Sequence, residues 1–572
     1  MRGSKFWGPV ALGVALAATA AAPASAAKPE PPKPPAKPDK PDKPGKPDKP
    51  GKPDPKPPIE QPAGDIKGVE LVHNLPEARA ATAINFMTYT KKGKGHGKGN
   101  TYDVMLVTGR FGLKTYDLSD PAKPKFLDEV TAEELRLPGD PPYSASNPTS
   151  TFWQNEDMDV DPNRKLALLS RDPRAYRGST TRSPGDPDPN GATNIAGVYV
   201  VDAKDPADLK LLSFKELPTG HTTTCINDCQ WLWTGGPASS TQQENELGWL
   251  GGRPIIATDL RDPRNPVSYP HKPVDLFRQD GVTAYAHDVD VDEAGIAWVA
   301  GLGGTRGYYT DGVHYDPIQG KKRKATPVDP IPYAGGGLSP ETTSEKFNPG
   351  TSVLGPNDGN AGGWMHNSWR PIGKNAPKDK RYKNGELLLG TEEWFGAGAN
   401  ACREEGKFTI SSLKGSYNGE GWKSTPEKPF RMKAVGSWAP ADNEGTVYNL
   451  SSCSAHYFDV DGALVTYAWY GQGTRFLDIS KPEKPIQIAY YRPDGGNVWA
   501  SYKHGDYIYT ADSTRGVDVL KFKKGVKAAS ARTKEVHAPT MSKAQQKFLR
   551  SIASKWVPDP ATGGLCLLPT GK

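Results

Sequence analysis

Residues 116–124 read Tyr-Asp-Leu-Ser-Asp-Pro-Ala-Lys-Pro, and related stretches begin at Val201, Thr258 and Leu477. In every copy an Asp precedes a Pro by four residues, and apolar runs flank the copies. An Asp side chain bonds to its own downstream backbone, while Pro presets a turn and removes a donor from the strand ladder. Each copy is therefore typical of a strand, a tight turn and a return strand.

A second pattern ends in Asp-Val-Asp and occurs at 156–161, 287–292 and 456–461. A turn follows each of these stretches, and an apolar run such as Leu166–Leu169 follows the turn. Together the two patterns describe a four-stranded antiparallel unit with two tight turns, which is the blade of a propeller. Because such units repeat along the chain, the sequence predicts an all-β protein with a β-propeller fold.

Seven blades of four strands each are the predicted number. Their approximate limits are 80–130, 150–215, 221–276, 284–335, 361–438, 450–492 and 496–524. Six or eight blades remain open, because blades three to five are hard to delimit. We expect Val69–Val72 to add a strand to the last blade near Val517–Phe522, which would close the ring and remove an exposed sheet edge.

The stretch Gly112–Pro121 and its relatives resemble the LVIVD-repeat proteins, whose repeats form propeller blades. The resemblance covers most of 100–525 in patches. It implies a secreted β-propeller and implies almost nothing about activity.

The propeller is placed at 66–526, and residues 527–572 form a C-terminal extension. Ser542 is a typical helix N-cap, and apolar side chains at helical spacing continue to Trp556. We therefore expect one short helix that docks against the propeller. A helix that binds a membrane surface or a partner is the alternative.

Residues 1–26 have the pattern of a signal peptide. A basic start is followed by the apolar run Gly8–Ala22, and small residues favour cleavage after Ala26 or Ala27. The apolar run has 15 residues, whereas a helix that spans a bilayer needs about 20. A buried core helix is disfavoured because a long polar segment follows at once. We expect a secreted protein, extracellular or cell-wall-associated, without a transmembrane anchor.

A proline-rich stalk is predicted at 27–60, where Lys-Pro-Asp and Lys-Pro-Gly repeat. Proline at nearly every third position favours an extended, disordered rod that has almost nothing to bury. Residues 28–58 hold nine Lys against four Asp and Glu30, so signal and stalk account for nearly all of the net charge of +7. The folded part is close to neutral, and a nucleic-acid partner is not expected.

All five cysteines lie beyond the stalk, and disulfides are the default in an oxidising compartment. Cys225 and Cys229 would close a small loop, and Cys402 and Cys453 a long one, which leaves Cys566. The sequence does not fix this connectivity. Cys225 and Cys229 do not form a Cys-x-x-Cys motif, which disfavours a redox or zinc-ribbon site.

The candidate site follows from the register of the blades. If the second pattern opens the innermost strand of each blade, then Glu156, His287 and His456 hold equivalent positions that face the central channel. His366 is the equivalent in blade five, and His221 is a weaker candidate in blade three. Several imidazoles and a carboxylate suit a divalent transition metal, namely Cu, Zn, Fe or Mn. The alternatives are hydrogen bonds between blades without an ion, and proton-transfer catalysis without a metal.

Other motifs, present or absent, narrow the range of possible functions. The run Asp288–Asp292 resembles a calcium loop, but its twelfth position holds Val299 in place of Glu, so a strand end with turn-forming Asp is the better interpretation. Gly-x-Ser-x-Gly, His-Glu-x-x-His and phosphate-binding Gly-x-x-x-x-Gly-Lys motifs are absent from the sequence, which disfavours hydrolase and nucleotide chemistry.

Two functions are compatible with these features. The first is a surface-exposed binding or interaction module, with a cell-wall polymer, an extracellular protein or a small ligand as its partner. A metal site in the central channel would belong to this module. The second is a metal-dependent oxidoreductase or lyase that uses the His/Glu ring at the channel mouth.

Overall fold

The structure is a computed structural model in which the described residues all belong to one compact unit, 59–572. The predicted signal peptide, nearly all of the stalk, Cys402, Cys453 and Cys566 lie outside the described residues. The described segments are 60–91, 100–138, 140, 156–172, 195–236, 246–247, 254–274, 278–279, 282–283, 285–302, 305–316, 319–334, 365–382, 384–393, 406–413, 433–440, 454–528, 534–547, 556–557 and 568–569.

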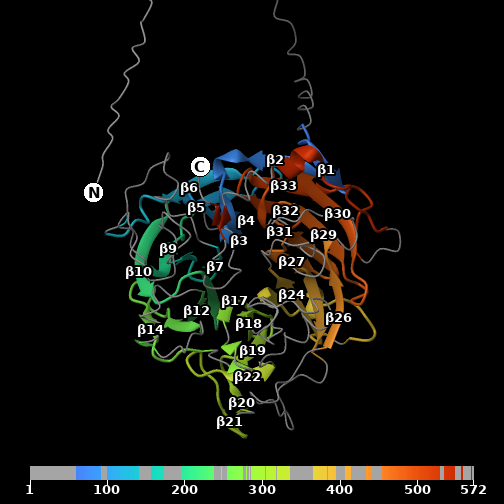
Figure 1. The fold of residues 1–572 in the computed structure, drawn as a ribbon. Coiled ribbons are helices and arrows are strands. Elements are labelled where there is room, and N and C mark those ends of the chain that lie inside the picture. The colour runs from blue at the N-terminus through green and yellow to red at the C-terminus, as the bar shows by residue number, and fades with distance from the viewer. Residues whose placement is uncertain are drawn as a thin grey trace, which may run out of the picture. The chain divides into compact units, whose positions relative to one another are not determined.

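Seven antiparallel sheets follow one another around a ring, as predicted (Figure 1). The strands of each blade are given from the innermost outward. Blade 1 contains β3 (Ala81–Thr90), β4 (Thr101–Gly109), β5 (Gly112–Asp117) and β6 (Lys125–Thr131), and blade 2 contains β7 (Met158–Asp161), β8 (Leu166–Arg171), β9 (Ala196–Asp202) and β10 (Lys210–Leu217). Blade 3 contains β11 (Thr222–Ile226), β12 (Trp231–Gly235), β13 (Ile256–Asp259) and β14 (Val267–Ser268), and blade 4 contains β17 (Tyr285–Val291), β18 (Ile296–Leu302), β19 (Arg306–Tyr309) and β22 (Ile331–Ala334).

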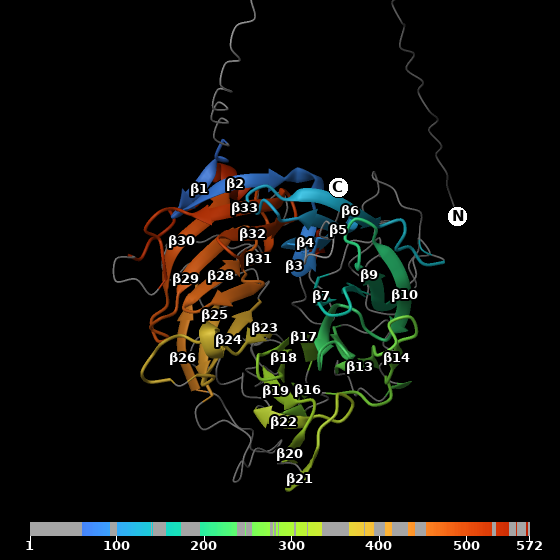
Figure 2. The same cartoon turned by 180° about the vertical axis from the view of Figure 1, so that it is seen from behind.

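Blades 5 to 7 complete the ring, which the view from behind shows from the other side (Figure 2). Blade 5 contains β23 (Met365–Trp369), β24 (Leu387–Glu392), β25 (Phe408–Ser412) and β26 (Lys433–Trp438). Blade 6 contains β27 (Phe458–Asp461), β28 (Leu464–Ala468), β29 (Thr474–Asp478), β30 (Ile486–Pro493) and β1 (Gly64–Lys67), and blade 7 contains β31 (Val498–His504), β32 (Tyr507–Asp512), β33 (Gly516–Phe522) and β2 (Val69–Leu75).

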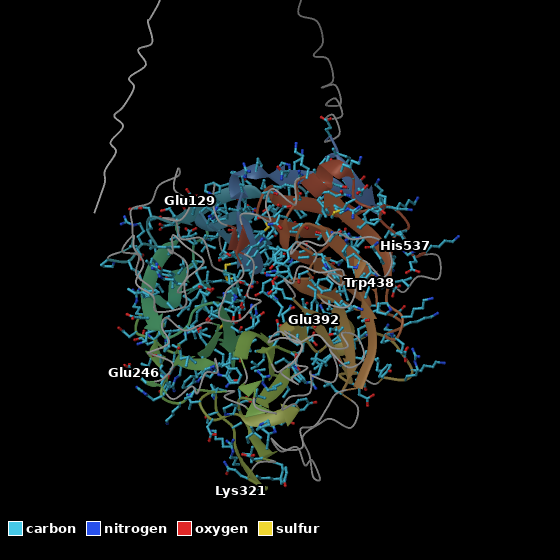
Figure 3. All side chains as sticks on the ribbon, viewed as in Figure 1. Glu129, Glu246, Lys321, Glu392, Trp438 and His537 are labelled. Carbon is cyan, nitrogen blue, oxygen red and sulfur yellow. A yellow bond between two sulfur atoms is a disulfide. The ribbon has the colours of Figure 1, made fainter. Side chains whose placement is uncertain are left out.

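Short elements join or extend the blades. The hairpin of β20 and β21 is inserted between β19 and β22, and it carries Lys321 at the edge of the ring (Figure 3). The remaining elements are β20 (Val313–Asp316), β21 (Lys321–Lys324), β15 (Arg278–Gln279), β16 (Val282–Thr283), β34 (Trp556–Val557), β35 (Leu568–Pro569) and the 3-10 turns Pro76–Ala78 and Gly373–Asn375.

The ring is closed by the N-terminal strand, as the sequence predicted. Strand β2 pairs with β33 and supplies the outer strand of blade 7, with Val69 opposite Phe522 and Leu75 opposite Val517. Strand β1 adds a fifth strand to blade 6, with Gly64 opposite Pro493. Among the described strands, blades 6 and 7 therefore each combine strands from both ends of the propeller. This pairing closes the ring.

The repeated Asp residues form the turns expected of them. In the first pattern, each Asp carboxylate accepts the backbone N–H two residues on: Ser119 N to Asp117 at 2.6 Å, Lys204 N to Asp202 at 2.9 Å, Arg261 N to Asp259 at 3.0 Å and Ser480 N to Asp478 at 2.8 Å. In the second pattern, Asp292 Oδ1 accepts the N–H groups of Ala294 and Ile296. The Asp292 carboxylate, at the end of the run that resembles a calcium loop, therefore caps a turn.

The core lies between the blades. Each of the seven hydrophobic clusters among the described residues joins two neighbouring sheets, from blades 1 and 2 around to blades 7 and 1. Trp233, Trp298 and Trp469 are fully buried in these clusters. Blade-to-blade burial of this kind fixes the innermost strands, and with them the side chains that face the channel.

The C-terminal extension contains the expected helix, with a different end. The helix begins at Lys543 after a capping box in which Gln545 N donates to Ser542 Oγ (3.2 Å) and Ser542 N donates to Gln545 Oε1 (2.7 Å). Trp556 was expected to be helical, but it pairs with Pro569 in the hairpin of β34 and β35. The extension docks on blade 6 as predicted, because Gln545 Nε2 donates to Asp65 Oδ2 at 3.0 Å. Within the described residues, no helix is long and apolar enough to cross a membrane.

Candidate metal centre

The innermost strands place one residue of each blade at the same level of the channel. Blades 2 to 6 supply the five residues that the sequence predicted there. Thr82 in blade 1 and Trp499 in blade 7 complete the set, and sequence reasoning missed both. In chain order the seven positions are Thr82, Glu156, His221, His287, His366, His456 and Trp499.

Bulges turn several of these residues toward the channel. The pairing register shifts between Ala81 and Ala83, between Ala286 and Asp288, and between Val498 and Ala500, so that Thr82, His287 and Trp499 are the extra residues of their strands. The register of β23 shifts across His366 in the same way. A bulge bends a strand locally and re-aims a side chain, which is why bulges are common beside functional sites.

The four imidazoles converge on one carboxylate. Glu156 Oε2 lies 2.9 Å from His221 Nε2, and Glu156 Oε1 lies 2.9 Å from His366 Nε2. The same Oε1 lies 3.2 Å from His456 Nε2 and 3.8 Å from His287 Nε2. All five side chains are fully buried. The structure therefore brings all five predicted residues to one point in the channel.

Outer partners fix the tautomer of three imidazoles. The Nδ1 atoms of His287 and His456 lie 3.0 Å and 2.6 Å from the carbonyl oxygens of His366 and Trp499. A carbonyl oxygen only accepts, so these Nδ1 atoms carry the hydrogen. His221 Nδ1 lies 2.7 Å from Asp172 Oδ2, which is the same arrangement with a carboxylate. In the neutral rings each Nε2 then offers a lone pair to the centre, as in histidine ligands of metals.

Two of these lone pairs face each other. His221 Nε2 and His287 Nε2 are 3.0 Å apart, a distance that needs a proton or a metal ion between them because two bare acceptors repel. Without a metal, His221 is the ring that takes the proton. Burial lowers its pKa, but Glu156 and Asp172 raise it by more, so that the pKa ends above its usual value.

The other groups of the centre titrate in the opposite sense. Burial, and then the charge of neighbouring imidazoles, holds the pKa of His287 well below its usual value and lowers the pKa of His366 to about 3. Burial raises the pKa of Glu156, but the ion pair with His221 outweighs it, and the pKa falls well below the usual value. Without a metal the centre thus pairs an anionic Glu156 with a protonated His221, while His287 and His366 are neutral. Metal ligands are ionised carboxylates and neutral imidazoles, so a metal ion would displace the His221 proton.

Two acidic residues of the centre were missed by the sequence analysis. Glu393 follows β24, and its oxygens lie 4.0 Å from His366 Nε2 and from His456 Nε2. Asp172 follows β8 in the same way. Second strands run antiparallel to the innermost ones, so their ends lie beside the starts of the innermost strands. One feature of the sequence could have identified both residues, namely an acidic residue directly after the apolar second strand of a blade.

The buried polar side chains meet the geometry expected for metal ligands in three overlapping groups. In each group one ligand atom from every residue lies within 4.8 Å of the others. These groups are Glu156–His221–His287, Glu156–His366–His456 and His287–His366–Glu393. Such His and carboxylate sets could hold a divalent transition metal.

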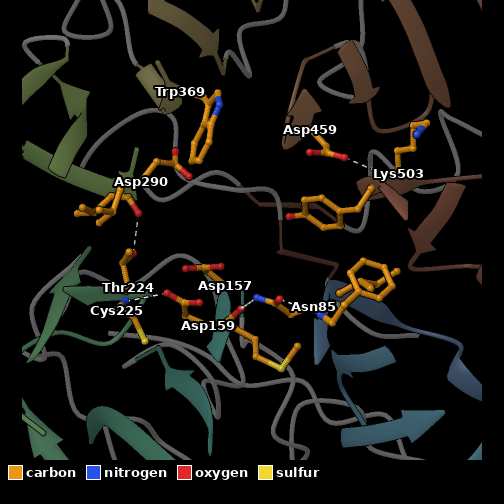
Figure 4. A pocket seen from close by; sticks show the side chains of 15 residues that line it. Asn85, Asp157, Asp159, Thr224, Cys225, Asp290, Trp369, Asp459 and Lys503 are labelled. Carbon is orange, nitrogen blue, oxygen red and sulfur yellow. Dashed lines mark hydrogen bonds between the residues drawn. The ribbon is translucent and has the colours of Figure 1, made fainter. Parts of the chain in front are cut away.

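A pocket of about 430 Å³ lies in the channel next to the centre (Figure 4). Every blade lines it through the residue three positions after the centre's residue. These lining residues are Asn85, Asp159, Thr224, Asp290, Trp369, Asp459 and Tyr502. Three of these carboxylates each accept a hydrogen bond from a backbone N–H of the next blade. Cys225 N donates to Asp159 (2.7 Å), Ser368 N to Asp290 (3.2 Å) and Lys503 N to Asp459 (2.9 Å).

One predicted disulfide is present. Cys225 and Cys229 are bonded across the turn between β11 and β12, with their Cα atoms 4.4 Å apart. Cys225 also lines the pocket. The predicted pairing of Cys402 with Cys453 falls outside the described residues.

No protein-family model and no curated protein matches the chain. The resemblance to LVIVD-repeat proteins therefore stays a prediction, while the seven-bladed propeller is established.

Solved structures of low sequence identity are similar to the chain. One, from Bacteroides uniformis and assigned provisionally as a 6-phosphogluconolactonase, has 9% identity and a TM-score of 0.41 over 77% of this chain and 98% of its own. Sqt1 of Chaetomium thermophilum, bound to the N-terminus of ribosomal protein L10, has 12% identity and a TM-score of 0.35 over 75% and 82%. The Mitotic Checkpoint Complex gives 8% identity and 0.37 over 83% and 96%. At these TM-scores no functional argument rests on the similarities.

Proposed function

We propose that this protein is an exported, metal-binding β-propeller in which Glu156, His221, His287, His366 and His456 hold one divalent transition metal ion. The observation that carries the proposal is the direction of the ring nitrogens. In His221, His287 and His456 the Nδ1 atom is directed to an outer acceptor. The Nε2 atoms of all four rings lie close to one carboxylate, that of Glu156.

Hydrogen bonds alone account poorly for this arrangement. His456 Nε2 lies 3.2 Å from Glu156 Oε1 yet makes no hydrogen bond with any described residue. A buried polar group without a partner costs about 1–3 kcal/mol. A cation at the centre would satisfy His456 and separate the facing nitrogens of His221 and His287, so it turns several unfavourable contacts into ligand bonds.

The centre favours a binding role over an open catalytic site. Five protein ligands and complete burial resemble closed structural metal sites, whereas catalytic sites keep a position for water or substrate. In this proposal the metal ties blades 2 to 6 together at the axis, and the loops and channel mouth bind a cell-wall polymer, an extracellular protein or a small ligand. The predicted signal peptide and stalk, together with the Cys225–Cys229 disulfide, support a secreted or cell-wall-associated location.

A metal-dependent oxidoreductase or lyase is the second candidate, and the pocket favours it. Asp157 lines the pocket and is the chain neighbour of Glu156. A small substrate in this space would lie next to the centre. It would have to displace one ligand, such as His287, whose Nε2 lies 3.8 Å from Glu156 Oε1.

Metal analysis of the purified chain tests the first proposal. We expect close to one transition-metal ion per chain by elemental analysis, and uptake of one ion after removal by a chelator. The His287→Ala and His456→Ala variants should lose the ion. The His504→Ala variant is the matched control, because His504 lies outside the centre and contacts Asp103. A folded, metal-free protein that takes up no ion on titration would overturn the proposal.

The same variants separate the two functions. If the protein is an enzyme, loss of metal in His287→Ala abolishes turnover while partner binding is kept. If the metal supports a binding surface, thermal stability and partner binding fall together.

A further inference from the structure

A second layer of polar side chains follows the centre by one residue, at the start of the innermost strands or on them. Its members from blades 2, 4, 5 and 6 are Asp157, Asp288, Asn367 and Tyr457. Asp288, Asn367 and Tyr457 are at least nine-tenths buried. Asp157 also lines the pocket, and the four side chains offer oxygen atoms where the centre offers mainly nitrogen atoms.

The carboxylates of this region have no described cation beside them. Asp157, Asp159, Asp290 and Asp459 line the pocket, and Lys503 is the only cationic residue of its described lining. The Lys503 ammonium is directed to Asp461, at 2.7 Å from its Oδ2. Carboxylates at this depth without a counter-ion cost free energy unless they take up protons or bind a cation.

Two neutral oxygens of the layer point to a ligand independently of the carboxylates. The Tyr457 hydroxyl is buried and has no hydrogen-bond partner among the described residues. The ring centroid of Tyr457 lies 4.7 Å from those of His366 and His456. The Asn367 Oδ1 atom is likewise buried without a partner among these residues.

We propose that this layer binds a hard divalent cation, with Ca²⁺ as its physiological class, through Asp157, Asp288, Asn367 Oδ1 and the Tyr457 hydroxyl. Carboxylate, amide and hydroxyl oxygens are hard ligands, and Ca²⁺ accepts six to eight of them in irregular geometry. The ligands come from four blades, so the site is unrelated to a calcium loop built from one contiguous segment. It is distinct from the transition-metal centre, whose ligands are mainly imidazoles.

The proposal predicts an unusual effect of removing the Tyr457 hydroxyl. In the cation-free protein that hydroxyl is a buried group without a partner, so Tyr457→Phe should leave stability unchanged or raise it. In the presence of Ca²⁺ the same change removes a ligand. The variant should therefore bind Ca²⁺ more weakly while it folds at least as well.

Equilibrium dialysis of the chelator-treated full chain against ⁴⁵Ca²⁺ tests the site. We expect one bound Ca²⁺ per chain with a Kd of about 1 mM or tighter, the range of extracellular calcium modules. Asp288→Asn and Asp157→Asn should weaken binding about tenfold or more, as expected for loss of one charged ligand. Asp506→Asn, in an exposed turn, is the matched control and should bind as the wild type. Circular dichroism confirms that each variant is folded.

Failure of this site and failure of the transition-metal centre give different results. The His287→Ala variant should lose the transition metal and keep Ca²⁺, whereas Asp288→Asn should do the opposite. No Ca²⁺ bound at about 10 mM, ten times the weakest expected Kd, or binding that survives both Asp variants and Tyr457→Phe, would overturn the proposal. An organic diamine could also neutralise these carboxylates. If a diamine stabilises the chain and Ca²⁺ does not bind, the proposal is overturned as well.

Discussion

Replacing Glu156 by Gln separates a metal centre from a hydrogen-bond network more sharply than any histidine substitution. Gln keeps the size and burial of the side chain but removes the charge that four imidazoles face. In the metal-free protein the change breaks the buried pair with His221, which costs about 3–5 kcal/mol when a partner is lost. Because Asp172 still holds His221 from the other side, we expect the lower end, about 3 kcal/mol.

Metal binding should add a second, measurable contribution to the free energy of unfolding. A ligand that binds only the folded state stabilises it by about 2.7 kcal/mol at 100 times its Kd. Chemical denaturation with and without metal should therefore show that gain in the wild type and none in Glu156→Gln. If the variant keeps both the ion and the gain, Glu156 is no ligand and the reasoning is refuted. If metal has no effect on the wild type, the network interpretation holds instead.

Three further predictions concern the surroundings of the centre and the blades. Asp172→Ala should weaken metal binding about 10–100-fold in competition with a chromophoric chelator, because the hydrogen bond that orients His221 is lost; unchanged affinity would contradict that role. Serine in place of Cys225 and Cys229 should lower the free energy of unfolding by about 2 kcal/mol, from the closure entropy of their short loop, and a change below about 0.5 kcal/mol would contradict it. Burial, and then Asp518, raises the pKa of Asp512 from 3.8 to about 6. Its proton is bound more tightly in the folded chain, so stability should fall by up to about 3 kcal/mol as pH rises from about 4 to 6. Burial raises the pKa of Asp290 and Asp459 as well, so Asp512→Asn should reduce the slope without abolishing it, and a variant with the slope of the wild type would refute the assignment.

Much of the fold could be predicted because its determinants are local and repeated. An Asp that caps its own turn, as Asp117 and Asp478 do, works the same way in four of the blades, so one chemical rule identifies several strand pairs. Ring closure by β2 was predictable for a related reason, since an apolar β run before the first blade matches an unpaired edge in the last.

The candidate site was most directly predictable where it shares the repeat, while His366 and His221 were candidates by their place in the blades alone. Glu156, His287 and His456 precede an Asp-Val-Asp signature, which fixes their register. Thr82 and Trp499 hold the same positions without that signature. Asp172 and Glu393 come from the second strands, and only the antiparallel return of those strands brings them to the centre.

The end of the C-terminal helix shows the limit of periodicity. Apolar spacing continued to Trp556, yet that residue pairs with Pro569 in a hairpin. A strand partner supplied by later residues overrides a helical pattern of this length, because most helix stability comes from tertiary packing.

The central claim is that the ring nitrogens of blades 3 to 6 and the Glu156 carboxylate hold a metal ion. A crystal structure of the natively purified chain, with anomalous data at the edge of the metal found by elemental analysis, tests it most directly. We expect one anomalous peak at about 2.0–2.2 Å from Glu156 and from the imidazole Nε2 atoms. An empty centre, with Glu156 still hydrogen-bonded to His221 and His366 in crystals grown with metal, would contradict it.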